Sequence, residues 1–178
     1  MNLPDHIEQI IKDFPTKSEP LLASDSYVRL IFKYLQNANS FLEIGYRKGL
    51  FCEICKAMDI KSVHVDISDK LLRATPTKKN RCLVSNSLDF LNNCTEQFDL
   101  IFQDGSKSFN VRIEEYAVIK NRNILSKNGV ILIDDLHYPE CMRAFDSAIK
   151  CGWYLGETIK VSNRKKYKFG VMKAGNNL

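Results

Sequence analysis

Residues 41–49 read Phe-Leu-Glu-Ile-Gly-Tyr-Arg-Lys-Gly, and this stretch decides the fold. It continues a short β-rich run, Ser40–Ile44, and leads into residues 50–58, whose apolar positions have helical spacing. Gly45 allows a sharp turn in which a ligand approaches the main chain, and Gly49 allows close packing at the start of the helix. The first turn of that helix offers free N–H groups to a carboxylate or phosphate. The stretch therefore predicts a strand–turn–helix unit, either as a ligand site or as an ordinary glycine-bearing loop.

The same alternation of short strand and longer helix continues along the chain. Further strands are predicted at 62–66, 81–85, 98–103 and 130–134, and helices at 25–35, 87–92, 111–125 and 139–150. Near-continuous apolar strands suit a parallel sheet that is buried on both faces. Residues 152–161 and 166–173 break the rhythm and predict two strands that pair antiparallel. We therefore expect an α/β fold, a Rossmann-like doubly wound, mostly parallel seven-stranded sheet with an antiparallel C-terminal hairpin.

Length and composition indicate one compact globular domain. The chain has 178 residues, of which 44% are apolar, and no apolar run is long enough to span a bilayer. The first ten residues lack the basic and apolar segments of a signal peptide, so we expect a cytoplasmic protein without membrane association. Prolines at positions 4, 15 and 20 favour a loosely docked extension over residues 1–24, followed by a domain over residues 25–178.

The six cysteines fit a reducing compartment, because most lie inside apolar segments. Cys52-x-x-Cys55 lies on one face of a predicted helix and has no second pair or nearby histidine, so core packing is favoured over zinc. The net charge is +5, and a late basic cluster favours a solvated hairpin over a nucleic-acid surface. That cluster consists of Lys160, Arg164, Lys165, Lys166, Lys168 and Lys173.

Polar side chains follow the next two strands. Asp66 ends the second strand about 20 residues after the glycine turn, where an acid reaches a pair of ribose hydroxyls. Asn86 and Ser87 follow the third strand and are placed either to contact a bound base or to serve as ordinary loop residues, with Ser87 as a helix cap. We expect Asp66 to bind ligand and leave both interpretations open for the other two.

Four stretches together resemble class I S-adenosylmethionine (SAM)-dependent methyltransferases. FLEIGYRKG resembles their first motif, with Glu43 in its acidic position, and VHVD resembles the second, whose acid holds the SAM ribose. FDLIFQDGSKSF and GVILIDD, the latter preceded by LSKNG, resemble the fourth- and fifth-strand motifs. The resemblance covers most of the chain and departs at Arg47, where the family often has glycine. It implies a SAM site formed by Glu43, Gly45, Gly49, Asp66, Asn86, Ser87 and Asp104.

Within that class, the chain resembles the small cation-dependent O-methyltransferases of the catechol and caffeoyl-CoA type and their bacterial relatives. Asp104-Gly-Ser-Lys107 matches their Asp-x-x-Lys element, although one bacterial branch has histidine where Lys107 stands, and Asp134-Asp135 replaces their Asp-Asn. The resemblance implies that Asp104, Asp134 and Asp135 bind Mg²⁺ or Mn²⁺, and that Lys107 and Asp104 are catalytic. A cation on the acceptor oxygen favours the alkoxide, and a nearby base takes the proton.

Other interpretations of these residues remain open. Strand-end aspartates also cap helices and bind loop N–H groups, and Lys107 fits equally a charge partner for Asp104. His137 is an alternative base or ligand. We expect a SAM-dependent O-methyltransferase for a small hydroxylated acceptor. A nucleic-acid methyltransferase and a non-catalytic SAM-fold module are the alternatives, and a homodimer remains open.

Overall fold

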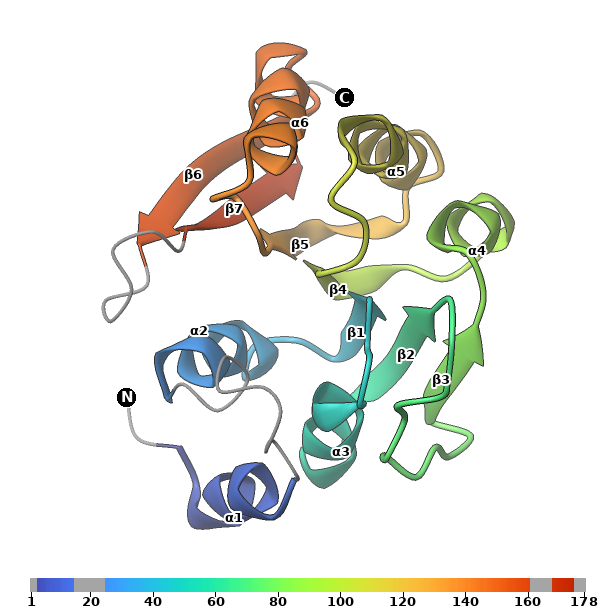
Figure 1. Cartoon of the computed structure of the whole chain (residues 1–178), viewed down its shortest axis with the longest axis vertical. Helices are drawn as coiled ribbons and strands as arrows, with labels where there is room; N and C mark the ends of the chain where they lie inside the picture. The colour runs from blue at the N-terminus through green and yellow to red at the C-terminus, as the bar shows by residue number, and fades with distance from the viewer. Residues whose placement is uncertain (1–2, 15–24, 161–167, 175–178) are drawn as a thin grey trace.

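The computed structural model describes residues 3–14, 25–160 and 168–174. Seven strands form one sheet in the order β3-β2-β1-β4-β5-β7-β6 (Figure 1). The strands are β1 (Ser40–Ile44), β2 (Lys61–Asp66), β3 (Asn80–Val84), β4 (Phe98–Gln103), β5 (Leu125–Ile133), β6 (Tyr154–Lys160) and β7 (Lys168–Ala174). Strands β1 to β5 are parallel, and β7 pairs antiparallel with both β5 and β6. This order confirms the predicted fold class, including the terminal hairpin.

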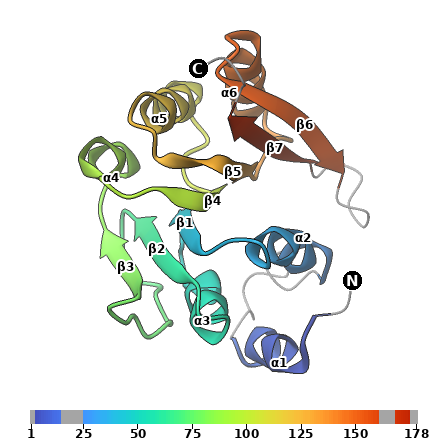
Figure 2. The same cartoon turned by 180° about the vertical axis from the view of Figure 1, so that it is seen from behind.

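Helices cover both faces of the sheet, as both views show (Figures 1 and 2). One layer holds α1 (Asp5–Asp13), α2 (Asp25–Leu35) and α3 (Leu50–Ala57), and the other holds α4 (Ser87–Asn93), α5 (Phe109–Asn121) and α6 (Pro139–Lys150). Alternate residues of each strand enter opposite cores: Leu42 and Ile44 join the core under α4–α6, whereas Phe41 joins the core under α1–α3. In the described ranges, no helix is long and apolar enough to cross a membrane.

The N-terminal helix is part of the domain core. Ile7 is fully buried, and Leu3 and Phe14 join the same apolar cluster as residues of α2 and α3. The prediction of a loosely docked extension is therefore wrong for residues 3–14. The prolines suggested a loop, but the apolar residues between them lie on one side of an amphipathic helix that the α3 layer buries. Residues 15–24 lie outside the described chain.

The boundary between α5 and β5 also differs from the expectation. The helix ends at Asn121, Asn123 adopts a left-handed conformation with φ 53°, and Leu125 already pairs with Phe98 of β4. Ile124 and Leu125 fit the helical spacing, so the sequence favoured a helix to residue 125 and a strand only from residue 130. A register irregularity between Phe98 and Leu100 lets β5 start early. The loop of the hairpin, with Arg164, Lys165 and Lys166 of the predicted basic cluster, lies outside the described residues.

Candidate functional site

A cavity of about 600 Å³ opens at the carboxyl edge of the parallel strands. Its walls come from the segments that follow β1, β2, β3, β4 and β5. This is the edge where open α/β sheets bind ligands, and the volume lies within the range of small-molecule sites, about 300–1,000 Å³. The structure brings seven predicted site residues to this cavity: Gly45, Asp66, Asn86, Ser87, Asp104, Lys107 and Asp135. The lining does not include Glu43, Gly49 or Asp134.

Gly45 lets the β1 turn approach the β4 loop. Its φ is +93°, and an added Cβ would lie 2.4 Å from the backbone oxygen of Asp104. The amide of Asp104 also donates to the carbonyl of Ile44, at 2.8 Å. Gly49 has a different role, because an added Cβ there would lie 2.7 Å from the Cβ of Ala74. As the sequence predicted, Gly45 shapes the turn, and Gly49 serves packing at the start of α3 rather than lining the cavity.

Asp66 anchors the same turn from the tip of β2. Its Oδ2 accepts a hydrogen bond of 2.8 Å from the backbone N–H of Arg47. Arg47 has a positive φ of 47°, although it is not glycine, and its side chain lines the cavity. Arg47 therefore keeps a left-handed turn without glycine and adds a cation to the cavity wall.

Arg47→Gly is expected to leave the free energy of unfolding unchanged or to raise it by up to about 1 kcal/mol. Glycine adopts the left-handed region without the steric cost of a Cβ, and the N–H that bonds to Asp66 is retained. Urea denaturation of both proteins measures the difference. A loss of more than about 1 kcal/mol would show that contacts of the side chain outweigh the backbone strain.

Glu43 lies behind the turn rather than in the cavity. Its Oε2 is 2.6 Å from Nδ1 of His64, and Nε2 of His64 is 2.8 Å from the hydroxyl of Ser62. Ser62 in turn accepts from the amide of Asn80, and all four residues are buried. The structure thus does not support the predicted contact of Glu43 with cofactor. The sequence analysis missed this network. Its signal was a histidine and a glutamate, each in the middle of a predicted buried strand, because two such polar groups need partners inside the core.

Burial shapes the protonation of this pair. Burial raises the pKa of Glu43, and its hydrogen bond to His64 partly opposes the rise. For His64, burial lowers the pKa, but the hydrogen bonds to Cys52 and Glu43 outweigh it and raise the pKa to about 9. The folded protein therefore holds the proton of this pair more tightly than the unfolded chain.

Stability is expected to fall as the pH rises above 6.5. Because the pKa of His64 is about 9 when folded and about 6.5 when unfolded, its stabilisation is complete below pH 6.5 and is lost as the pH rises toward 9. Between pH 6.5 and about pH 8, where unfolded-chain cysteines are still mostly protonated, wild type should lose on the order of 1.5 kcal/mol. Urea denaturation at several pH values measures this loss, and His64→Gln should flatten it. Identical pH slopes in both proteins would contradict the assignment.

Asn86 and Ser87 have structural partners as well as places in the cavity wall. The side-chain oxygen of Asn86 accepts from the N–H of Leu88 at 2.9 Å and caps α4, so Asn86 rather than Ser87 is the helix cap. The Ser87 hydroxyl donates to the carboxylate of Glu115 on α5. Because the side-chain oxygen of Asn86 is engaged at the helix cap and the Ser87 hydroxyl at Glu115, the Asn86 amide N–H₂ is the group of this pair best placed to donate to a ligand.

The three aspartates do not form the predicted metal site. Oδ1 of Asp134 accepts the N–H of Asp135 at 2.6 Å, so the Asp134 carboxylate closes its own turn and does not line the cavity. Asp135 adopts a positive φ of 67° and directs its carboxylate to Lys107 instead. Across the described chain, no three His, Cys, Asp or Glu side chains are grouped so as to hold one metal ion. These residues thus do not fit the implied Mg²⁺ or Mn²⁺ site.

Asp104 is a cavity carboxyl with a raised pKa. Burial raises its pKa well above the usual range, and the charges of Asp134 and Asp135 raise it further, against the opposing charge of Arg112. A carboxylate that binds its proton strongly is a stronger base once it is ionised. Asp104 therefore fits the predicted catalytic position.

Lys107 is held as a cation at the cavity rim. Its ammonium lies 3.3 Å from Oδ2 of Asp135 and 4.2 Å from the centre of the Tyr138 ring. Partial burial lowers its pKa, but Tyr138 and Asp135 outweigh that effect, and the net pKa is raised. The charge partner is thus Asp135 rather than Asp104, and the amine stays protonated at neutral pH. His137 lies near the same carboxylate, with its Nε2 3.9 Å from Oδ1.

A buried polar face of α5 ties the cavity loops together. Arg112 is fully buried and donates from Nε to the carbonyl of Ser106 and from Nη1 to the carbonyl of Asp134, at 2.5 and 2.9 Å. One turn on, Glu115 accepts from Ser87 and from Gln103 at the end of β4. These contacts connect the ends of β3, β4 and β5 to one helix.

Sequence reasoning missed Arg112 and Glu115 and saw only the apolar residues of this helix. The signal was their spacing, because Arg112, Glu115, Tyr116 and Ile119 follow i, i+3, i+4, i+7 and are all buried. Polar residues at two of four positions on a core face predict buried partners, which the ends of the neighbouring strands supply.

Comparison with known proteins supports the architecture. No family model and no curated protein matches the chain. Among solved structures, a Podospora anserina methyltransferase bound to S-adenosylhomocysteine (SAH) matches 99% of this chain and 90% of its own, at 16% identity and a TM-score of 0.72. The O-methyltransferase TomG of Streptomyces achromogenes, in complex with SAM, matches 98% and 91%, at 15% identity and a TM-score of 0.65. A Bacillus cereus O-methyltransferase in complex with SAH matches 98% of this chain and 92% of its own, at 16% identity and a TM-score of 0.64. At these identities the likeness shows the fold, and the chain has the Rossmann-like fold of these methyltransferases.

Proposed function

We propose that this chain is a SAM-dependent O-methyltransferase for a small hydroxylated acceptor, in which helix α1 packs into the methyltransferase domain together with the part that begins at residue 25. The main support for this proposal is the cavity at the carboxyl edge of the sheet, which is lined by Gly45, Asp66 and Asp104. The fold is shared with proteins solved in complex with SAM or SAH. The expected cytoplasmic location is part of the same proposal.

The cavity residues fit SAM. The tight approach at Gly45 leaves main chain rather than side chain along the ligand path, and Asp66 stands at the tip of β2 where an acid accepts from ribose hydroxyls. Ile67 is 77% exposed yet lines the cavity, which suits an apolar contact with the face of a base. Bound SAM supplies an electrophilic methyl group on a sulfonium sulfur.

The acceptor hydroxyl needs a base and a compensating charge. We assign the base to Asp104, whose carboxylate lines the cavity and has a raised pKa. We assign Lys107 to charge compensation of the developing alkoxide, because Asp135 and Tyr138 hold it as an ammonium. Methyl transfer then requires mainly alignment of the oxygen with the methyl carbon and sulfur.

Calorimetric titration with SAH tests the cofactor site. Wild type should bind, and Asp66→Asn should weaken binding roughly tenfold to a hundredfold, because it removes the charge from two ligand hydrogen bonds. Asp89→Asn is the matched control, since Asp89 is exposed on α4 outside the cavity. Absence of any heat with wild-type protein and either SAM or SAH would refute the proposal.

Metal removal separates this proposal from the cation-dependent version. Because the carboxylates do not form an ion site, methyl transfer to a hydroxylated acceptor should be unchanged by EDTA. Loss of turnover with EDTA, restored by Mg²⁺, would show that ligand binding rearranges Asp134 and Asp135. Two other outcomes would favour the alternatives. RNA binding that weakens as the salt concentration rises would favour a nucleic-acid methyltransferase. SAM binding without turnover on any hydroxylated acceptor would favour a non-catalytic module.

A further inference from the structure

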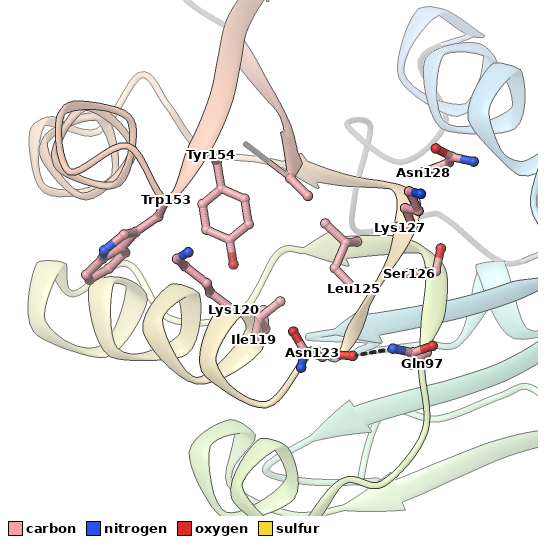
Figure 3. A pocket seen from close by; sticks show the side chains of 11 residues that line it. Gln97, Ile119, Lys120, Asn123, Leu125, Ser126, Lys127, Asn128, Trp153 and Tyr154 are labelled. Atoms are coloured by element: carbon pink, nitrogen blue, oxygen red, sulfur yellow. Dashed lines mark hydrogen bonds between the residues drawn. The ribbon is translucent and has the colours of Figure 1, made fainter. Parts of the chain in front are cut away.

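A second cavity, of about 590 Å³, opens at the opposite edge of the sheet (Figure 3). It lies where β4 and β5 begin, between the last turn of α5 and the residues that join α6 to β6. The methyltransferase cavity is formed by the other ends of the same strands, and the two cavities share no lining residue. The second cavity is therefore a separate place for a ligand, apart from the proposed active site.

The floor of this cavity is apolar and aromatic. Ile119, Leu125 and Tyr154 are buried, and the partly buried Trp153 stands beside Tyr154 along the chain (Figure 3). The Tyr154 hydroxyl already donates to the backbone oxygen of Tyr116, at 2.9 Å, and the residue is 2% exposed, so the partly exposed Trp153 is the main aromatic surface that the cavity offers. A planar ring fits such a surface better than a sugar or an extended polar molecule.

The rim is cationic. Lys120 comes from the last turn of α5 and Lys127 from the start of β5, so the two ammonium groups stand on different walls. Neither forms a hydrogen bond or ion pair within the described chain, and none of the described lining residues carries a carboxylate. Nearby Asp99 lies outside the lining and is occupied by Asn39 and Ser126. Among the described residues, the cavity thus attracts negative charge without offering it a counterion in its lining.

We propose that this cavity is a second ligand site for a small aromatic carboxylate. Its ring packs against Trp153, Tyr154 and Leu125, and its carboxylate pairs with Lys120, with Lys127 adding to the positive field. Of the polar side chains in the lining, Gln97 donates to the carbonyl of Asn123 at 3.0 Å (Figure 3), and the Ser126 hydroxyl donates to Asp99. A planar aromatic acid would gain binding free energy here from two interactions, the packing of its ring and a charge-assisted hydrogen bond of its carboxylate.

The chain has a single tryptophan, so the indole N–H of Trp153 gives one resolved signal in a ¹⁵N–¹H spectrum of the whole protein. We expect 2-naphthoate to shift this signal in a saturable way. The neutral 2-naphthamide should bind about tenfold more weakly or worse, since it keeps the ring and loses the charge. Equal binding of acid and amide, or no shift at millimolar naphthoate, would overturn the proposal.

Two double variants locate the site. Lys120→Ala with Lys127→Ala should abolish the preference for acid over amide, whereas Lys70→Ala with Lys78→Ala, on the exposed segment between β2 and β3, should keep it. Retention of that preference in the first variant would overturn the assignment of Lys120. Saturating SAH should leave naphthoate affinity unchanged, because the cavities share no lining residue. If wild type binds SAH but not naphthoate, only the proposal for the second cavity fails. If it binds naphthoate but neither SAM nor SAH, only the proposed function fails.

Discussion

Gly45→Ala is expected to destabilise the protein by roughly 2–5 kcal/mol and to abolish SAH binding. The new Cβ would lie 2.4 Å from a backbone oxygen and 2.7 Å from a backbone carbon of Asp104, and backbone atoms cannot rotate away as a side chain does. The positive φ of 93° adds strain for any residue with a side chain. Relief requires the β1 and β4 loops to separate, which also dismantles the cavity wall. Urea denaturation and SAH calorimetry measure the two effects.

Gly152→Ala is the matched control for this prediction. Gly152 also has a positive φ, +69°, but an added Cβ would meet nothing within 4 Å. It should therefore lose only the cost of the left-handed conformation, about 1 kcal/mol, and keep full SAH binding. Equal losses in the two variants would show that backbone strain, rather than the approach of the two loops, makes Gly45 necessary.

Arg112→Met is expected to lower the free energy of unfolding by about 3 kcal/mol and to weaken SAH binding. Methionine keeps much of the length of the side chain but leaves the buried carbonyls of Ser106 and Asp134 without their donors. Removing a buried charge offsets part of this cost, because Nη2 of Arg112 is buried with no partner among the described residues. Binding weakens because the loops after β4 and β5 lose their common tie to α5.

Arg112→Lys separates geometry from charge. Lysine keeps the positive charge but cannot reach both carbonyls as the planar guanidinium does, so it should recover only part of the lost stability. Arg143→Met serves as the control, because Arg143 is exposed on α6, pairs with Glu140 and lies over the Phe109 ring, and its loss should change stability by no more than about 1 kcal/mol. An Arg112→Met protein as stable as Arg143→Met would rule out the proposed tie. Denaturant titration with SAH calorimetry measures each variant.

The sequence by itself determined the sheet and the location of the cavity. Five strands with near-continuous apolar residues, each followed by a turn residue, require burial on both faces and hence helical layers on each side. The carboxyl ends of parallel strands meet at one edge, so Gly45, Asp66 and Asp104 had to lie close together once the strand order was right. Local patterning and chain direction are enough for these conclusions.

Only the tertiary structure decided which partner each polar side chain has. Glu43 pairs with His64 because β1 and β2 place them opposite each other in register under α3. Asp134 turns to its neighbour's N–H, and the buried face of α5 brings Arg112 against the loops that carry Asp104 and Asp135. A buried polar group must find a hydrogen bond among the groups that packing puts within about 3 Å. That choice depends on side chains distant in sequence, which no local pattern records.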